Sequence, residues 1–63
     1  MRIFVEDYRL EQGLSLSELS RRSGVAKSHI SGIESGDTIP TIVVLCKIAK
    51  ALDVPCCVLF SCD

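Results

Sequence analysis

Apolar residues recur every three or four positions along most of the chain, a spacing that places them on one face of an α-helix. The first such segment predicts a helix over about residues 2–12, followed by Gly13, a residue type that commonly ends helices in left-handed geometry. One face of this helix would carry Met1, Val5, Tyr8 and Gln12. No segment alternates convincingly between apolar and polar residues, so we expect no β-strand.

The start of the second helix is the best-marked boundary in the sequence. Ser15 and Glu18 have the spacing of a capping box, in which each side chain bonds the backbone N–H of the other residue. Leu14 and Leu19 stand at the positions of a hydrophobic staple, which packs the residue before a helix against its first turns. The second helix is therefore predicted to begin at about Leu16.

A glycine separates the second helix from the third. Gly24 interrupts the helical pattern, after which Ile30 and Ile33 recur three residues apart. This spacing indicates a short helix over about residues 27–34, and the run Ser-Gly-Asp at 35–37 closes it.

Two more helices are predicted in the last third of the chain. Thr41 follows a proline and is a favourable N-cap, so it begins a fourth helix that reaches about Asp53. Pro55 can open a last short helix over about residues 56–60. The core face of the fourth helix would comprise Ile42, Leu45, Ile48, Ala49 and Leu52. The predicted fold class is therefore all-α, with five short helices.

The segments GLSLSELSRRSGVAKSHISGIESG and IPTIVVLCKIAKALDVPCCVLF together cover most of the chain. Their pattern resembles that of the phage repressor and Cro-like helix-turn-helix family, also called XRE-type regulators. The resemblance implies a compact five-helix, lambda-repressor-like DNA-binding fold in which the second and third helices form the helix-turn-helix. It also implies a single domain over residues 1–63, with the helix-turn-helix at about 15–34 and a dimerisation region at about 41–63.

The same resemblance assigns DNA recognition to the third helix, with base contacts near its start. Lys27 can donate to guanine acceptors, Ser28 can read either base pair loosely, and His29 would lie close to the backbone or a base edge. Arg21 and Arg22 would contact phosphates, or else form an ordinary solvated helix face. His29 is the single histidine of the chain and has no partner that the sequence identifies, which disfavours a catalytic or metal-binding role.

The resemblance further implies an ion pair between an arginine of the first helix and the glutamate that ends the third helix. These residues are Arg9 and Glu34. The role implied for the pair is structural, because it would orient the recognition helix without touching a base.

Charge weakens the implied contact with DNA. The chain has a net charge of −1, and residues 15–36 contain three basic and two acidic side chains. Gly32 stands where the family usually has a long polar or basic side chain, and Asp37 where a basic side chain often meets the phosphate. Because phosphate neutralisation supplies most non-specific affinity, we expect weak, salt-sensitive binding by a monomer and a need for two half-sites.

Apolar side chains beyond those that the core needs predict a homodimer. Val43 and Val44 on the fourth helix, and Cys57 and Val58 on the fifth, stand where related domains often carry polar residues. An apolar patch of this kind is more often a partner surface than an accident. A twofold dimer would hold two recognition helices about 34 Å apart and prefer a near-palindromic DNA site.

Composition favours a small cytoplasmic protein without a cofactor or a membrane segment, because the acidic start and the short apolar runs fit neither a signal peptide nor a membrane span. Cys46 and Cys56 replace the usual aliphatic residues and would act as small hydrophobes with reduced thiols. The alternative is a zinc or thiol-sensing site at Cys57 and Cys62, with Cys56 as a further ligand. Their spacing matches no ordinary zinc pattern.

These features favour one function over two others. The favoured one is a sequence-specific DNA-binding transcriptional regulator, a repressor acting as a dimer on double-stranded DNA. The alternative is a protein-interaction module on the same scaffold, such as an antitoxin or an accessory subunit, with weak DNA binding. An enzyme is disfavoured, because the sequence shows no nucleophile with an assembled base and leaves no room for a deep pocket.

Overall fold

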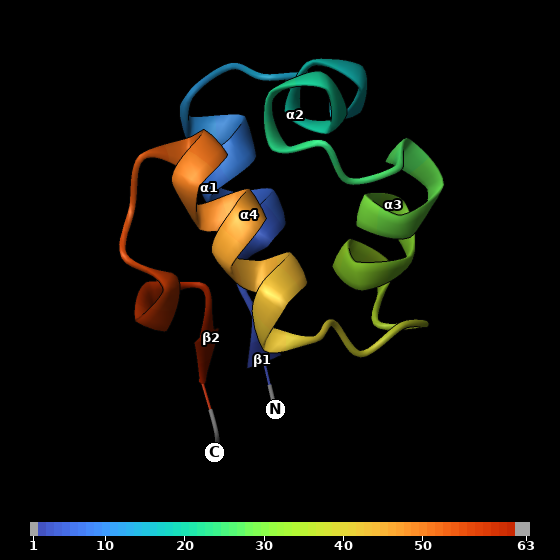
Figure 1. The fold of residues 1–63 in the computed structure, drawn as a ribbon, viewed down its shortest axis with the longest axis vertical. Coiled ribbons are helices and arrows are strands. Elements are labelled where there is room, and N and C mark those ends of the chain that lie inside the picture. The colour runs from blue at the N-terminus through green and yellow to red at the C-terminus, as the bar shows by residue number, and fades with distance from the viewer. Residues whose placement is uncertain (1, 62–63) are drawn as a thin grey trace.

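The computed structural model describes residues 2–61, which form a small helical domain (Figure 1). Helices α2 and α3 lie at the top and right of Figure 1, and α4 crosses in front of α1. Strands β1 and β2 lie beside each other at the lower end. In chain order the elements are β1 (Arg2–Ile3), α1 (Val5–Glu11), α2 (Leu16–Ser23), α3 (Lys27–Ser35), α4 (Ile42–Leu52), the 3₁₀ turn η1 (Cys56–Val58) and β2 (Phe60–Ser61).

The expectation of five helices and no strand was wrong at both ends of the described chain. Residues Arg2–Ile3 pair antiparallel with Phe60–Ser61, so the first helix begins at Val5 rather than at residue 2. The N–H of Phe4 also donates to the carbonyl of Leu59 at 2.8 Å, which extends the contact between the two ends. Strands of two residues are too short to show an alternating pattern, which is why the sequence did not reveal them.

The predicted last helix over residues 56–60 is a single 3₁₀ turn of three residues. The N–H groups of Val58 and Leu59 donate to the carbonyls of Pro55 and Cys56 at 3.2 and 3.1 Å. The chain then leaves the turn to enter β2, because pairing with β1 satisfies its backbone groups. Within residues 2–61 the fold therefore has four α-helices, one 3₁₀ turn and one two-stranded ribbon.

The hydrophobic core lies where α1, α2, α3, α4 and the segment after η1 meet. Its members are aliphatic: Val5, Leu14, Leu19, Val25, Ile30, Ile33, Leu45, Ile48, Ala49, Leu52 and Leu59. The predicted core face of α4 was right except at Ile42, which is 62% exposed. Val44, by contrast, is partly buried and packs against the core. The start of α4 therefore presents a different face to the core than the spacing indicated.

The predicted starts of α2 and α4 are confirmed by their caps. The N–H of Glu18 donates to Ser15 Oγ at 3.1 Å, and the N–H of Ser15 donates to Glu18 Oε1 at 3.2 Å, which completes the capping box. Thr41 Oγ1 accepts from the N–H of Val44 at 3.2 Å at the start of α4. These side chains satisfy backbone donors that a helix leaves free in its first turn.

The turn between α2 and α3 is held by left-handed backbone and by serine side chains. Gly24 ends α2 with φ = 77°, a conformation that favours glycine. Ser20 Oγ donates to the carbonyl of Val25 at 2.6 Å, and the N–H of Val25 donates to Ser23 Oγ at 3.2 Å. Because Val25 is itself buried, both its backbone and its side chain set the angle at which α3 leaves α2.

None of the helices within residues 2–61 has the length and apolar character needed to cross a membrane.

Candidate nucleic-acid interface

Helix α3 has one face anchored in the core and the other open to solvent. Ile30 and Ile33 are fully buried. Lys27 and Ser28 lie in the first turn and are exposed, whereas His29 is half-buried. The structure thus brings Lys27, Ser28 and His29 together at the start of one rigid helix, with the first two able to meet a ligand directly.

The N-terminus of α3 also carries no side-chain cap. Ala26 occupies the N-cap position, and no side chain bonds the first-turn amides. Backbone N–H groups at a helix start attract anions, since the helix dipole concentrates positive charge there. The loss of a capping side chain at Ala26 therefore leaves these amides available to an incoming phosphate.

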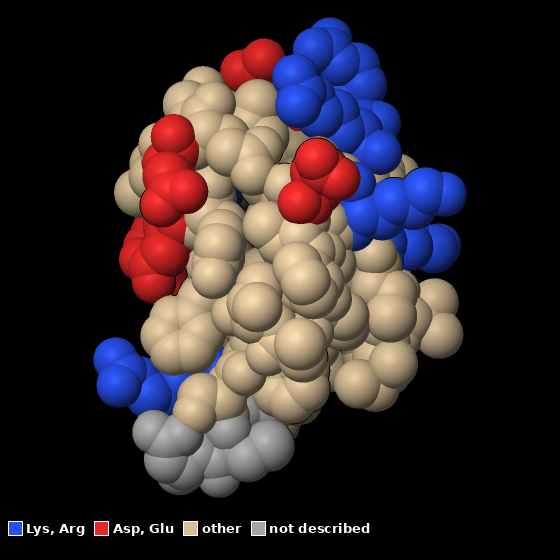
Figure 2. Space-filling model, turned by 90° about the vertical axis from the view of Figure 1, so that its left-hand side faces the viewer, with Lys and Arg blue, Asp and Glu red and all other residues tan. Residues whose placement is uncertain are grey.

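Charged side chains form separate groups on the face of the molecule shown in Figure 2. Basic side chains gather at the upper right, with a smaller group at the lower left, and acidic side chains lie at the left, at the top and beside the upper basic group. The acidic side chains of α1 are Glu6, Asp7 and Glu11. The basic group at the upper right is a local concentration of positive charge that the net charge of −1 does not reveal.

The sequence predicted phosphate contacts at Arg21 and Arg22 but not at two lysines of α4 that lie nearby. Arg21 and Arg22 are exposed in the last turn of α2. An open hollow of about 440 Å³ is lined by Arg22, Ser23, Lys47, Lys50 and Ala51. Lys47 and Lys50 are exposed on α4 and are three residues apart. This spacing predicts that they share one face of the helix, but it does not predict that this face lies beside α2.

The predicted ion pair between Arg9 and Glu34 is confirmed. Arg9 Nε donates to Glu34 Oε2 at 2.9 Å, and a second guanidinium nitrogen donates to Oε1 at 3.2 Å. The third nitrogen donates to the carbonyl of Leu14 at 2.8 Å. Arg9 is only 8% exposed, and the hydrogen bond to Glu34 holds its pKa above the ordinary value despite burial. The ion pair holds the end of α3 against α1, and the bond from Arg9 to Leu14 holds α1 against the residues that precede α2.

Gly32 has a packing role that the family resemblance did not predict. Its carbonyl accepts from the N–H groups of Asp37 and Thr38 at 2.9 and 3.1 Å, and from Ser35 Oγ at 3.1 Å. A Cβ at position 32 would lie 2.8 Å from Thr38 Oγ1. The segment after α3 therefore folds back onto position 32, so a side chain there would meet Thr38.

We expect Gly32→Ala to destabilise the domain by about 1 kcal/mol, because overpacking against Thr38 outweighs the better helix propensity of alanine. Urea unfolding would measure the change. In a Thr38→Ala background the clash with Oγ1 is gone, so the same substitution should be neutral or stabilising. Equal effects in the two backgrounds would show that Thr38 does not restrict position 32.

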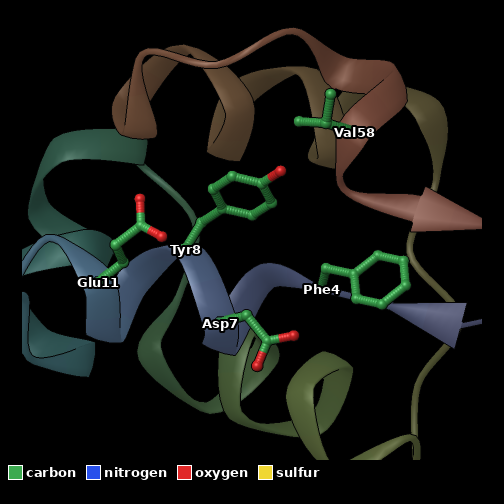
Figure 3. Close-up of a pocket in the computed structure, with 5 residues that line it drawn as sticks. All are labelled: Phe4, Asp7, Tyr8, Glu11 and Val58. Carbon is green, nitrogen blue, oxygen red and sulfur yellow. The ribbon is translucent and has the colours of Figure 1, made fainter.

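The four side chains expected in the dimer interface differ in their exposure. Val43 is exposed near the start of α4, where Ile39 and Ile42 are exposed as well. Val58, in contrast, is half-buried and lines a hollow of about 380 Å³ between η1 and α1 (Figure 3). The other residues that line this hollow are Phe4, Asp7, Tyr8 and Glu11. Val44 is half-buried and Cys57 is exposed.

The cysteines are arranged differently from the expected pattern of buried small hydrophobes. Cys56 is half-buried and packs against the core, but Cys46 is exposed, so the expectation was wrong for Cys46. The two sulfur atoms lie 3.6 Å apart. Of the alternative thiol or zinc site, Cys57 is exposed and Cys62 lies outside the described residues. Among residues 2–61 no group of three histidine, cysteine or acidic residues is placed to hold a metal ion.

Comparison with known proteins agrees with the helical fold. Residues 5–59 match the helix-turn-helix family. The chain is 49% identical over 51 residues to the HTH-type transcriptional regulator SinR of Bacillus subtilis, covering 79% of this chain and 46% of SinR. It is 39% identical over 51 residues to the regulator SutR of Escherichia coli, covering 81% of this chain and 29% of SutR. The chain thus spans less than half the length of these relatives.

Solved structures give the same result. The restriction-modification controller protein C.AhdI from Aeromonas hydrophila superposes with a TM-score of 0.86 at 34% identity, over 89% of this chain and 85% of that one. The N-terminal DNA binding domain of SinR superposes with a TM-score of 0.85 at 42% identity, over 94% of this chain and 87% of that one. With the sequence match over residues 5–59, these likenesses show that the chain belongs to the helix-turn-helix family of the phage repressor and Cro-like (XRE) type.

Proposed function

We propose that the protein is a sequence-specific DNA-binding transcriptional regulator that reads its site through α3. The observation that carries this proposal is the exposure of Lys27 and Ser28 on a helix whose opposite face is fully buried. A reading helix must present polar side chains while its own position is fixed, and Arg9 fixes the far end of α3 through Glu34. The relatives that are named as transcriptional regulators support the same function.

In the proposed complex α3 lies in the major groove with its first turn against the base edges. Lys27 donates to O6 and N7 of a guanine, and Ser28 donates or accepts at a neighbouring base. His29, being half-buried, approaches the DNA backbone or a base edge from the side of the helix. Arg21 and Arg22 neutralise phosphates, and the uncapped backbone N–H groups at the start of α3 donate to a further phosphate.

The proposed regulator acts as a repressor in the form of a twofold homodimer on a near-palindromic site. The exposed apolar side chains at the start of α4, Ile39, Ile42 and Val43, support a partner surface there. The interface proposed from the sequence consists of Val43, Val44, Cys57 and Val58. A dimer doubles the small positive charge of the reading surface and makes the second half-site contact intramolecular, which raises overall affinity.

Two experiments test this proposal. The first selects the duplexes that the protein binds from a random DNA library at about 0.1 M salt. The second measures the solution mass of the protein at micromolar concentration. We expect enrichment of a sequence with two half-sites spaced by about one helical turn, and a mass that rises towards a dimer with concentration. A single enriched half-site with a constant monomer mass would contradict the dimer. No enrichment by folded protein would contradict the DNA-reading function.

The second candidate function is a protein-interaction module, such as an antitoxin or an accessory subunit. The observation that favours it is the exposure of three large apolar side chains around the start of α4, a surface suited to another protein rather than to DNA. The weak positive charge of residues 15–36 points in the same direction. An absence of DNA selection, as in the preceding experiment, would favour this function.

A further inference from the structure

Two thiols from separate elements meet at the surface between α4 and η1. Cys46 lies in the middle of α4 and Cys56 opens η1, ten residues later in the chain. Their sulfur atoms are 3.6 Å apart, close to van der Waals contact. A disulfide requires the sulfurs to approach to about 2 Å, and rotation of the side chains about their Cα–Cβ bonds can bring them closer.

We propose that Cys46 and Cys56 form an oxidisable thiol pair, which a peroxide converts into an intrachain disulfide. The pair lies outside the proposed reading surface, since neither residue lies on α2 or α3. It shares Cys56 with the thiol or zinc site considered from the sequence, which would have used Cys57 and Cys62 with Cys56 as a further ligand, but it pairs Cys56 with Cys46 instead.

The reaction proceeds in two balanced steps with hydrogen peroxide as the oxidant. In the first step the thiol of Cys46 takes one oxygen atom from the peroxide, which gives a sulfenic acid and releases one water. In the second step the sulfur of Cys56 attacks the sulfenic sulfur, the S–S bond forms, and the hydroxyl leaves with the proton of Cys56 as a second water. Two thiols are oxidised, and one peroxide molecule is reduced.

The difference in solvent exposure between the two cysteines determines which sulfur reacts with peroxide first. Cys46 is exposed and meets the oxidant first, whereas Cys56 is half-buried against the core. Burial raises the pKa of Cys56, and the neighbouring Cys46 raises it further. Because the thiolate is the reactive form, Cys56 is slower to react with peroxide and serves as the resolving sulfur.

Cys57 is adjacent to Cys56 in sequence but points elsewhere. In a 3₁₀ turn successive side chains are rotated by about 120° around the axis, so two neighbouring residues cannot both face α4. Cys57 is exposed, and the sulfur that lies 3.6 Å from that of Cys46 belongs to Cys56. Cys57 is therefore the matched control for the pair.

The bond would tie η1 to α4 within the region proposed for dimerisation. A cross-link removes conformations from the unfolded chain, so the oxidised protein should unfold at a higher urea concentration than the reduced protein. Because the pair lies at the surface, a dithiol reductant should reverse the reaction.

The test oxidises the reduced full chain with hydrogen peroxide and follows intact mass and free thiols measured after denaturation. The chain has four cysteines. We expect loss of two hydrogens without cross-linked dimers, a fall in free thiols from four to two, and recovery with dithiothreitol. Trypsin should then release residues 28–47 joined to residues 51–63, because the lysines at 47 and 50 separate the two sulfurs.

Variants identify the pair. Cys57→Ser/Cys62→Ser retains only Cys46 and Cys56 and should still lose two hydrogens, whereas Cys46→Ser and Cys56→Ser in the otherwise natural chain should not form the joined peptides. If Cys46→Ser or Cys56→Ser fails to fold, the double variant decides the question without them. Retention of both thiols in the double variant, or oxygen addition without the S–S bond, would overturn the proposal.

Discussion

Arg9→Ala is expected to lower the free energy of unfolding by about 3 kcal/mol. The substitution removes three hydrogen bonds at once, two to Glu34 and one to the carbonyl of Leu14. It also leaves the carboxylate of Glu34, whose side chain is only 6% exposed, without its partner charge. A domain of 63 residues has only a few kcal/mol of stability, so much of the variant should be unfolded at physiological temperature.

Urea denaturation followed by circular dichroism measures this loss, and two variants control it. Arg21→Ala removes the same charge from an exposed helix position and should change stability by no more than about 0.5 kcal/mol. Arg9→Lys keeps the charge but not the two parallel bonds to the carboxylate, so it should fall between the wild type and Arg9→Ala. A loss for Arg9→Ala equal to that for Arg21→Ala would show that the buried pair does not hold α3 in place.

Lys27→Ala is expected to weaken binding to the selected DNA site by about tenfold to one hundredfold. The loss for random duplex should be much smaller, because there the lysine supplies only a phosphate-like ionic contact. The ratio of the two affinities, measured by fluorescence anisotropy at several salt concentrations, is the informative quantity. That ratio should fall for Lys27→Ala, since this side chain lies at the exposed start of α3.

Lys50→Ala is the matched control for this measurement. It removes the same charge from an exposed helical lysine, but Lys50 lies on α4 beside Arg22 rather than on α3. We expect it to weaken selected and random duplexes alike and to reduce the slope of log affinity against log salt by about 1 if it contacts a phosphate. If both lysine variants changed the affinity ratio equally, the reading surface would not be the start of α3.

The local features of the fold were predictable because they depend on residues close together in the sequence. The capping box at Ser15 and Glu18 is written in a spacing of three residues, and its bonds join those same residues in the structure. Thr41 and Gly24 likewise mark the start of α4 and the end of α2 through their own side chain or backbone. The family resemblance added one long-range contact, the bond between Arg9 and Glu34.

Features that depend on which distant segments meet were not predictable. The strands at Arg2–Ile3 and Phe60–Ser61 exist only because the two ends of the chain lie side by side, and neither has a pattern of its own. Ile42 is exposed because the first residues of α4 extend beyond the core. Helical spacing defines which face of a helix is apolar, but it does not show where along the helix that face stops contacting the core.

The same division separates the parts of the two proposed sites. Helical periodicity after the break at Gly24, which acts over three or four residues, placed Lys27 and Ser28 at the start of a helix with a buried opposite face. The fold of the whole chain, by contrast, brought Lys47 and Lys50 beside Arg22 and the sulfur of Cys46 next to that of Cys56. Hydrophobic burial drives helix packing and has no preferred direction. The way the helices pack therefore determines which surface side chains become neighbours, and the local spacing of residues does not encode these neighbours.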